Sequence, residues 1–386
     1  MERAGNWSFP TSVRFGSGRI AELGVAAKSL GMTRPLVVTD ARLAAAPLTE
    51  RALAILAEDD VPAALFAEVK PNPNAAHIAA GLQALRRGRH DGVIALGGGS
   101  ALDAGKVIAF MAGQRRRLWE FEDVGDAWLH ADAGGILPVI AVPTTAGTGS
   151  EVGRAGVVTD EVRRTKRIIF HPRMMPSIAI CDPELTLGLP PVLTAGTGMD
   201  ALAHCLEAYC VASYHPLADG VALEGMRLVK DNILRAYRSG SDLEARAHMM
   251  AAAAMGATAF QKGLGAMHAL AHPVGALHDT HHGMTNAVVM PYVLAFNRPA
   301  IAERIARLAA YLGLTATFAA FLDWLLELRG ALDVPHTLTG LGIGDDQIEV
   351  MGTMAARDPT AAGNPVPIDA RICRRLYRDA LAGRIG

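Results

Sequence analysis

The first half of the chain alternates short hydrophobic runs with amphipathic stretches. Three runs rich in valine, isoleucine and leucine have the length of buried strands, at residues 34–39, 91–96 and 137–142. A stretch with helical spacing, residues 43–56, follows the first run, and another begins near Ser100 after the second. Strands separated by helices predict a parallel sheet with right-handed crossovers, so we expect an α/β domain here.

The second half of the chain has a different pattern. Long segments rich in alanine, methionine and leucine carry apolar residues at helical spacing, with little of the alternation typical of strands. The segments that we expect to be helices are 193–211, 217–237, 245–260, 265–277, 300–312 and 315–329. The change falls in the turn-rich piece 182–191. We therefore predict two domains, an α/β domain of residues 1–188 and an all-helical domain of residues 189–386.

Composition narrows the class of protein and its partners. The chain is 51% hydrophobic and 19% charged, which is typical of globular proteins, and its net charge of −1 favours neither nucleic acid nor an anionic membrane as a partner. The longest apolar stretch, around residues 249–260, is shorter than the about 20 residues that cross a bilayer. The cysteines lack the spacing of disulfides, and residues 1–18 lack the apolar core of a signal peptide, so we expect a cytoplasmic protein.

Two glycine-containing loops follow predicted strands. Gly97-Gly98-Gly99 comes after the run 91–96, and the segment PTTAGTGSE, residues 143–151, comes after the run 137–142. Glycines let a backbone approach a phosphate, and ligands of open α/β sheets bind beyond the carboxyl ends of the strands. The two loops together favour a nucleotide site over a plain tight turn. Asp40 directly follows the first run. Its carboxylate could bind ribose hydroxyls, which would favour NAD over NADP, or it could cap the next helix.

Histidines gather in one part of the helical half. They are His268, His272, His278, His281 and His282. His268 and His272 are four residues apart and share one helix face, and Asp200 and His204 repeat that spacing upstream. Two such helices in an apolar domain predict a site for a divalent metal, whereas a histidine such as His204 alone is more often a core residue. The spacing fixes neither which three histidines bind nor whether the metal is Fe²⁺, Zn²⁺, Mn²⁺ or Co²⁺.

Five motifs together resemble those of the iron-containing (group III) alcohol dehydrogenases. The motifs are GGGSALDAGK at 97–106, PTTAGTGSEV at 143–152, DPELTLGLP at 182–190, GMDALAHCLEAY at 198–209 and GLGAMHALAHPVGALHDTHHGMTNAVVMP at 263–291. The resemblance covers nearly the whole chain, from Phe15 to the NPVPI piece at Asn364. That family is related in fold to glycerol dehydrogenase and dehydroquinate synthase. The resemblance therefore implies a Rossmann-like α/β domain followed by an all-α domain, the dehydroquinate synthase-like architecture.

Residue by residue, the resemblance implies a metal site, a catalytic histidine and a cofactor site. The implied metal ligands are Asp200, His204, His268 and His282, with Fe²⁺ as the metal and Zn²⁺ as the alternative. His272 matches a histidine near the substrate, a candidate catalytic proton relay. The positions that match cofactor contacts, for NAD rather than NADP, are Asp40, Asn72, Gly98, Gly99, Ser100, Asp103, Thr144, Thr145, Thr148 and Lys166.

A shortened spacing bears on the substrate. Only Gln261 and Lys262 separate the AF pair from GLG, where many family members have three residues, and this form resembles the branch that acts on ω-hydroxy acids such as 4-hydroxybutyrate. Lys262, Arg154 and His171 are then candidates to bind a substrate carboxylate; the alternative is that they are surface charges outside the pocket.

The function that the resemblance implies is a metal-dependent, NAD-linked alcohol dehydrogenase or aldehyde reductase. Its substrate would be a small primary alcohol or an ω-hydroxy acid, and the enzyme would be a homo-oligomer, most simply a homodimer. Two alternatives keep the fold: a hydroxyacid–oxoacid transhydrogenase, and a lyase of the dehydroquinate synthase type. A module that binds nucleotide or metal without catalysis is a third alternative.

Overall fold

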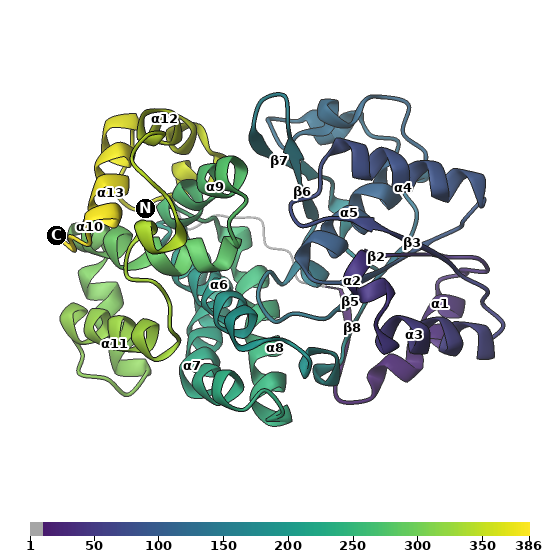
Figure 1. The fold of residues 1–386 in the computed structure, drawn as a ribbon, viewed down its shortest axis with the longest axis horizontal. Coiled ribbons are helices and arrows are strands. Elements are labelled where there is room, and N and C mark those ends of the chain that lie inside the picture. The colour runs from purple at the N-terminus through teal and green to yellow at the C-terminus, as the bar shows by residue number, and fades with distance from the viewer. Residues whose placement is uncertain (1–10) are drawn as a thin grey trace. The chain divides into compact units, whose positions relative to one another are not determined.

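The structure, a computed structural model, describes residues 11–386, which divide into two compact units (Figure 1). One unit comprises residues 11–145 and 149–188, and the other comprises residues 146–148 and 189–386. The chain therefore changes unit near the turn-rich piece 182–191. The expectation that no signal peptide precedes the first domain falls largely on residues 1–10, which lie outside the described residues.

A parallel sheet forms the centre of the first unit. Within residues 11–386 it has the strand order β1-β8-β5-β4-β2-β3. The strands are β1 (Ser12–Phe15), β2 (Leu36–Asp40), β3 (Ala64–Val69), β4 (Val93–Gly97), β5 (Val139–Pro143) and β8 (Ile178–Cys181). In the pairing of β4 with β5, Gly97 lies opposite Pro143. The loops that follow these two strands therefore start at the same edge of the sheet.

Helices surround this sheet, and its two faces are buried in separate hydrophobic clusters. Val37 and Ile94 belong to one cluster, and Val38 and Ala95 to the other, because successive residues of a strand point to opposite faces. The helices are α1 (Leu23–Ser29), α2 (Ala41–Ala44), α3 (Pro47–Glu58), α4 (Ala75–Arg87) and α5 (Gly99–Met111). An antiparallel hairpin of β6 (Ala155–Asp160) and β7 (Thr165–Phe170) completes the unit.

The second unit is helical. Its helices are α6 (Pro191–Cys210), α7 (Pro216–Arg238), α8 (Leu243–Ala259), α9 (Ala266–His278), α10 (His282–Tyr311), α11 (Phe318–Ala331), α12 (Ile348–Arg357) and α13 (Ala370–Ala382). Helix α6 packs against α7, α8 and α10, and every residue from Thr194 to Cys210 is buried. Polar side chains on α6 are therefore removed from solvent and must find partners inside the unit.

The structure confirms the fold class, with corrections at two predicted helices. The predicted helix 43–56 is two helices, because Pro47 has no N–H to continue α2 and instead starts α3 at its first position. The predicted helix 300–312 is only the end of α10, which begins at His282 and continues through Pro291 and Pro299. Among residues 11–386, no helix is both long and apolar enough to cross a membrane.

Candidate metal centre and cofactor loops

Three helices of the second unit present the predicted metal ligands. Asp200 and His204 lie one turn apart on α6, and His268 lies in the first turn of α9. His282 is the first residue of α10. Asp200, His204 and His268 are only 3%, 5% and 2% exposed. The buried positions on α6 and α9 are consistent with a site that is shielded from water.

These side chains converge. One ligand atom from each of Asp200, His204 and His268 lies within 4.8 Å of the others, which is a spacing that a single metal ion can bridge. The imidazole rings of His204 and His268 are 4.7 Å apart between centroids. His282 is not a member of this tight trio, but its Nε2 lies 3.7 Å from Oδ1 of Asp200, and its ring is 5.2 Å from that of His268.

Two further residues shape this cluster. The amide nitrogen of Asn286 donates to Oδ1 of Asp200 at 2.9 Å and lies 3.3 Å from Nε2 of His268 and 3.2 Å from Nε2 of His282. Gly283 brings α10 against α6, because a Cβ at this position would lie 2.2 Å from the carbonyl oxygen of Gly196. A side chain there would push His282 away from Asp200. Sequence reasoning missed Asn286, although it follows His282 by one helical turn.

The protonation states fit a metal site. Burial lowers the pKa of His204 to about 4, so its imidazole is neutral near pH 7, the form that binds metals. Nδ1 of His204 is buried without a hydrogen-bond partner in the structure. Burial also tends to lower the pKa of His268, but the carboxylate of Glu207 outweighs it and raises this pKa. A metal at Nε2 would take the place of that proton. One carboxylate and three imidazoles form a mixed oxygen and nitrogen site that suits Fe²⁺ or Zn²⁺.

His272 has an acidic partner of its own. Its Nδ1 lies 2.7 Å from Oδ2 of Asp358, and its ring stacks on that of His282 with centroids 5.3 Å apart. Burial tends to raise the pKa of Asp358, but His272 and Thr360 hold it below its usual value. Asp358 is therefore a carboxylate that orients the imidazole of His272. The sequence pattern gave no sign of Asp358, which is 86 residues away in the chain.

The other two clustered histidines have different surroundings. His281 caps α10, where its Nδ1 accepts a hydrogen bond from the backbone of Met284 at 3.2 Å. His278 is the last residue of α9, and Asp279 after it adopts a left-handed backbone with φ of 51°. His281 therefore has a structural role as a helix cap. His268 and His282, in contrast, lie beside Asp200 and His204 of α6.

In the first unit, the two glycine-containing loops lie against each other. Gly97 ends β4 with φ of 147°, a conformation that favours glycine, and its carbonyl accepts a hydrogen bond from the backbone of Thr144 at 3.0 Å. Gly98 caps α5, and a Cβ there would lie 3.2 Å from Cγ2 of Thr145. Gly99 and Ser100 begin α5, so the free N–H groups of this helix lie at the predicted phosphate-binding turn.

Asp103 serves as a structural link in this region. It accepts hydrogen bonds from the hydroxyl of Ser150 at 2.5 Å and from the backbone of Val157 at 3.0 Å, and it pairs with Lys106 at 3.2 Å. Nζ of Lys106 in turn donates to the carbonyls of Ser150 and Ala155. These contacts hold the loop at residues 150–155 against α5, so Asp103 has a structural role in this loop.

The remaining predicted cofactor residues are spread over both units. Asp40 caps α2, and its Oδ1 accepts from the backbone of Arg42 and Leu43 at 2.9 and 3.0 Å. Asn72 has φ of 52°, and its carbonyl accepts from the hydroxyl of Thr159, the residue opposite Lys166 in the hairpin. Asn72 and Lys166 therefore belong to one neighbourhood. Thr148 belongs to the short piece 146–148 that groups with the helical unit.

The three candidate substrate residues have partners inside the protein. Nζ of Lys262 is buried and forms an ion pair with Asp219 at 2.6 Å. The guanidinium of Arg154 lies over the ring of Phe170, 5.5 Å from its centroid. His171 is buried, its Nδ1 accepts from the backbone of Arg173 at 3.0 Å, and burial lowers its pKa, so its imidazole is neutral near pH 7. Lys262 is a buried charge, contrary to the alternative of a surface position.

Comparisons with known families match both halves of the chain. A family model for iron-containing alcohol dehydrogenase matches residues 10–183, and a model for the C-terminal part of the Fe-containing alcohol dehydrogenase family matches residues 194–381. A curated relative, 4-hydroxybutyrate dehydrogenase of Cupriavidus necator, is 38% identical over 96% of this chain and 98% of its own length.

Solved structures agree with these matches. The crystal structure of a 1,3-propanediol oxidoreductase superposes with a TM-score of 0.93 at 33% identity, over 98% of this chain and 100% of that chain. Sulfoacetaldehyde reductase from Bifidobacterium kashiwanohense, solved in complex with NAD⁺, superposes with a TM-score of 0.89 at 28% identity, over 98% and 99% of the two chains.

Proposed function

The chain belongs to the iron-containing alcohol dehydrogenase family and is an NAD-linked alcohol dehydrogenase, and we propose that it interconverts a short ω-hydroxy acid such as 4-hydroxybutyrate with its aldehyde. The convergence of Asp200, His204, His268 and His282 supports a metal-dependent enzyme. The similarity to 4-hydroxybutyrate dehydrogenase supports the ω-hydroxy acid as its substrate. We propose these four as the ligands of a divalent metal, Fe²⁺ or alternatively Zn²⁺. When bound, such a metal supplies Lewis acidity that polarises the substrate oxygen.

The side chains of the protein prepare the site for this chemistry. Asn286 donates to Oδ1 of Asp200 and so fixes the direction in which the carboxylate faces. We propose His272 as the proton relay. Because its Nδ1 is held by Asp358, the proton that leaves or enters the substrate hydroxyl would pass through Nε2.

We propose residues 1–188 as the domain that binds NAD and residues 189–386 as the domain that binds metal and substrate. The glycine turn at Gly98 and Gly99 exposes the start of α5 to a pyrophosphate, and Thr144 and Thr145 border the same turn. Both cap hydrogen bonds of Asp40 use Oδ1, so Oδ2 can accept from ribose hydroxyls. A carboxylate there disfavours a 2′-phosphate, which supports NAD over NADP.

A pair of substrates of equal length tests the substrate proposal. 4-Hydroxybutyrate and 1,4-butanediol share a four-carbon chain and differ in whether one end carries a carboxylate. We expect kcat/KM, measured as NADH formation by absorbance, to be higher for the hydroxy acid. Equal or better turnover of the diol would contradict the proposal. The transhydrogenase alternative predicts instead that no free NADH accumulates until an oxo acid is supplied.

We further propose a cytoplasmic homodimer. In the part of the chain that the structure describes, β1 and β3 are the outer strands of the sheet, and Val13 and Phe15 of β1 are 40% and 42% exposed. An outer strand with apolar side chains is a favourable surface for pairing with a second copy. The four cysteines are free thiols and buried, which supports a reducing compartment. Sedimentation of the wild type and of Phe15→Arg tests the dimer: a monomeric wild type would contradict it.

A further inference from the structure

Glu207 shares the face of α6 that carries two proposed metal ligands, Asp200 and His204. Glu207 follows His204 by three residues and Asp200 by seven, so all three lie on the same side of the helix. Glu207 is only 5% exposed. A carboxylate buried this deeply destabilises a protein unless hydrogen bonds compensate its charge. Its partners therefore indicate what it does.

Both oxygens of Glu207 bind the first turn of α9. Oε1 accepts a hydrogen bond from the backbone N–H of Met267 at 2.6 Å, and Oε2 lies 2.5 Å from Nδ1 of His268. The N–H groups of a first helical turn have no partner within the helix, and Gly265 before this turn provides no side-chain cap. One carboxylate from α6 thus caps α9 and contacts the imidazole that α9 contributes to the metal site.

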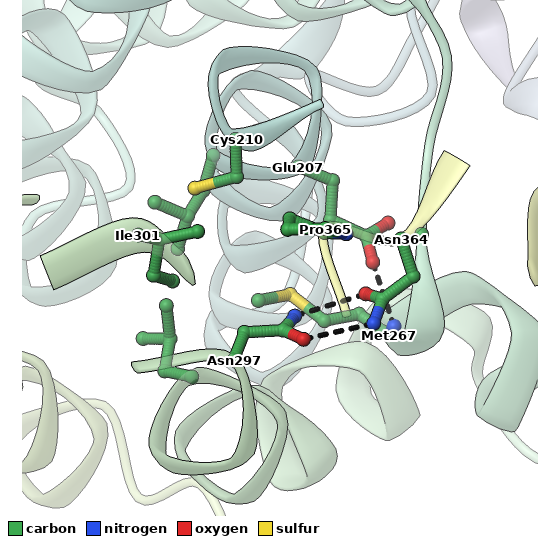
Figure 2. A pocket seen from close by; sticks show the side chains of 10 residues that line it. Glu207, Cys210, Met267, Asn297, Ile301, Asn364 and Pro365 are labelled. Carbon is green, nitrogen blue, oxygen red and sulfur yellow. Dashed lines mark hydrogen bonds between the residues drawn. The ribbon is translucent and has the colours of Figure 1, made fainter. Parts of the chain in front are cut away.

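Asn364 also binds the first turn of α9, but it does not contact the imidazole of His268. Oδ1 of Asn364 accepts from the backbone of Ala266 at 3.1 Å, and the amides of Asn364 and Asn297 pair with each other at 2.9 and 2.8 Å. Figure 2 shows Glu207, Asn297 and Asn364 lining one pocket. Asn364 therefore offers an internal control, because it shares the capping task of Glu207 but not the contact with His268.

We propose that Glu207 is a positioning residue that sets the tautomer and direction of His268, and thereby the affinity of the site for metal. A carboxylate only accepts hydrogen bonds, so the imidazole must donate from Nδ1 and leaves the lone pair of Nε2 for a metal. That Nε2 faces Asn286 at 3.3 Å, on the side where Asp200 and His282 converge. This inference rests on the ligand set proposed above.

The substitution Glu207→Gln isolates the effect, because it keeps the shape and removes the charge. If the glutamine amide faces His268, its N–H groups meet Nδ1 and favour the tautomer with the proton on Nε2, where the metal should bind. If the amide faces Met267 instead, two donors meet and the cap is lost. The first arrangement reverses the hydrogen bond to His268, and the second removes the one to Met267. The control Asn364→Ala removes a cap and leaves the contact between Glu207 and His268 intact.

The experiment is a titration of metal-free protein with Co²⁺, followed by the visible absorption of the bound ion. We expect Glu207→Gln to weaken Co²⁺ binding by about 10–100-fold, with NAD⁺ affinity unchanged, and Asn364→Ala to weaken it less. Glu207→Gln with the affinity of the wild type, or an equal loss in Asn364→Ala, would overturn the inference. If Glu207→Gln is insoluble, Glu207→Asp replaces it, and wild-type affinity in that shorter side chain overturns the inference in the same way. Failure of the wild type itself to bind Co²⁺ would instead overturn the proposed metal site.

Discussion

Glu151 lies in the loop after β5 as a buried carboxyl group. It is 1% exposed, and its Oε2 has no hydrogen-bond partner in the structure. Burial raises the pKa of Glu151 from 4.5 to about 7, and the nearby charge of Lys106 offsets only part of that effect. We expect the substitution Glu151→Gln, which resembles the neutral form of the side chain, to stabilise the first unit at alkaline pH.

The direction of the change in stability with pH follows from the protonation of Glu151 in the folded and unfolded chain. Between pH 4.5 and about 7 the unfolded chain releases the proton of Glu151 while the folded chain keeps it. The wild type therefore loses stability as the pH rises through this range, and the loss is complete above about pH 7. A shift from 4.5 to about 7, at about 1.4 kcal/mol for each pH unit, corresponds to about 3 kcal/mol. The variant lacks this loss.

The assay is thermal unfolding of metal-free, NAD-free protein at pH 5 and pH 8. We expect Glu151→Gln to unfold near the wild-type temperature at pH 5 and up to about 10 °C above it at pH 8. Glu58→Gln is the matched control, because Glu58 ends α3 at an exposed position of the same unit. A variant whose difference from wild type is the same at both values of pH would refute the reasoning.

Two further substitutions test the cofactor loop and the proton relay. Gly98→Val places a side chain against Thr145, where even a Cβ would be 3.2 Å from Cγ2. At an overpacking cost of about 1–3 kcal/mol, we expect NADH affinity, measured by fluorescence titration, to fall by about 5–150-fold with metal content unchanged. Asp358→Asn removes the charge that orients His272, and we expect kcat to fall by about 100-fold with a small change in KM in steady-state assays. Undiminished NADH affinity in the first variant, or undiminished kcat in the second, would contradict these roles.

The sequence predicted three of the central strands, whose residues form continuous apolar runs, but not the short β8, although all four of its residues are buried. Strands β2, β4 and β5 consist of uninterrupted buried residues apart from the partly exposed Asp40, so their pattern is clear. Strand β3 was missed because its exposed and buried residues mix. Helix α13 was missed because only Cys373, Leu376, Tyr377 and Ala380 are buried among many charged residues. The start of α10 was missed because Pro291 and Pro299 resemble helix breaks.

The site was predictable only where its residues repeat within one helix. The spacing of Asp200 with His204, and of His268 with His272, is local and visible in the chain. Partners that come from other elements leave no such trace. The contacts of Glu207 with His268 and of Asn286 with Asp200 span 61 and 86 residues, and only the packing of the helices brings them together.

The central claim is that four side chains hold one metal ion, and metal content tests it most directly. We expect anaerobically purified wild-type protein to contain about one Fe²⁺ or Zn²⁺ per chain by elemental analysis, since a single cluster of ligands is present among residues 11–386. His268→Ala is expected to lose the metal and its turnover while NAD⁺ binding stays measurable. A His268→Ala protein that is free of metal and fully active would contradict the account.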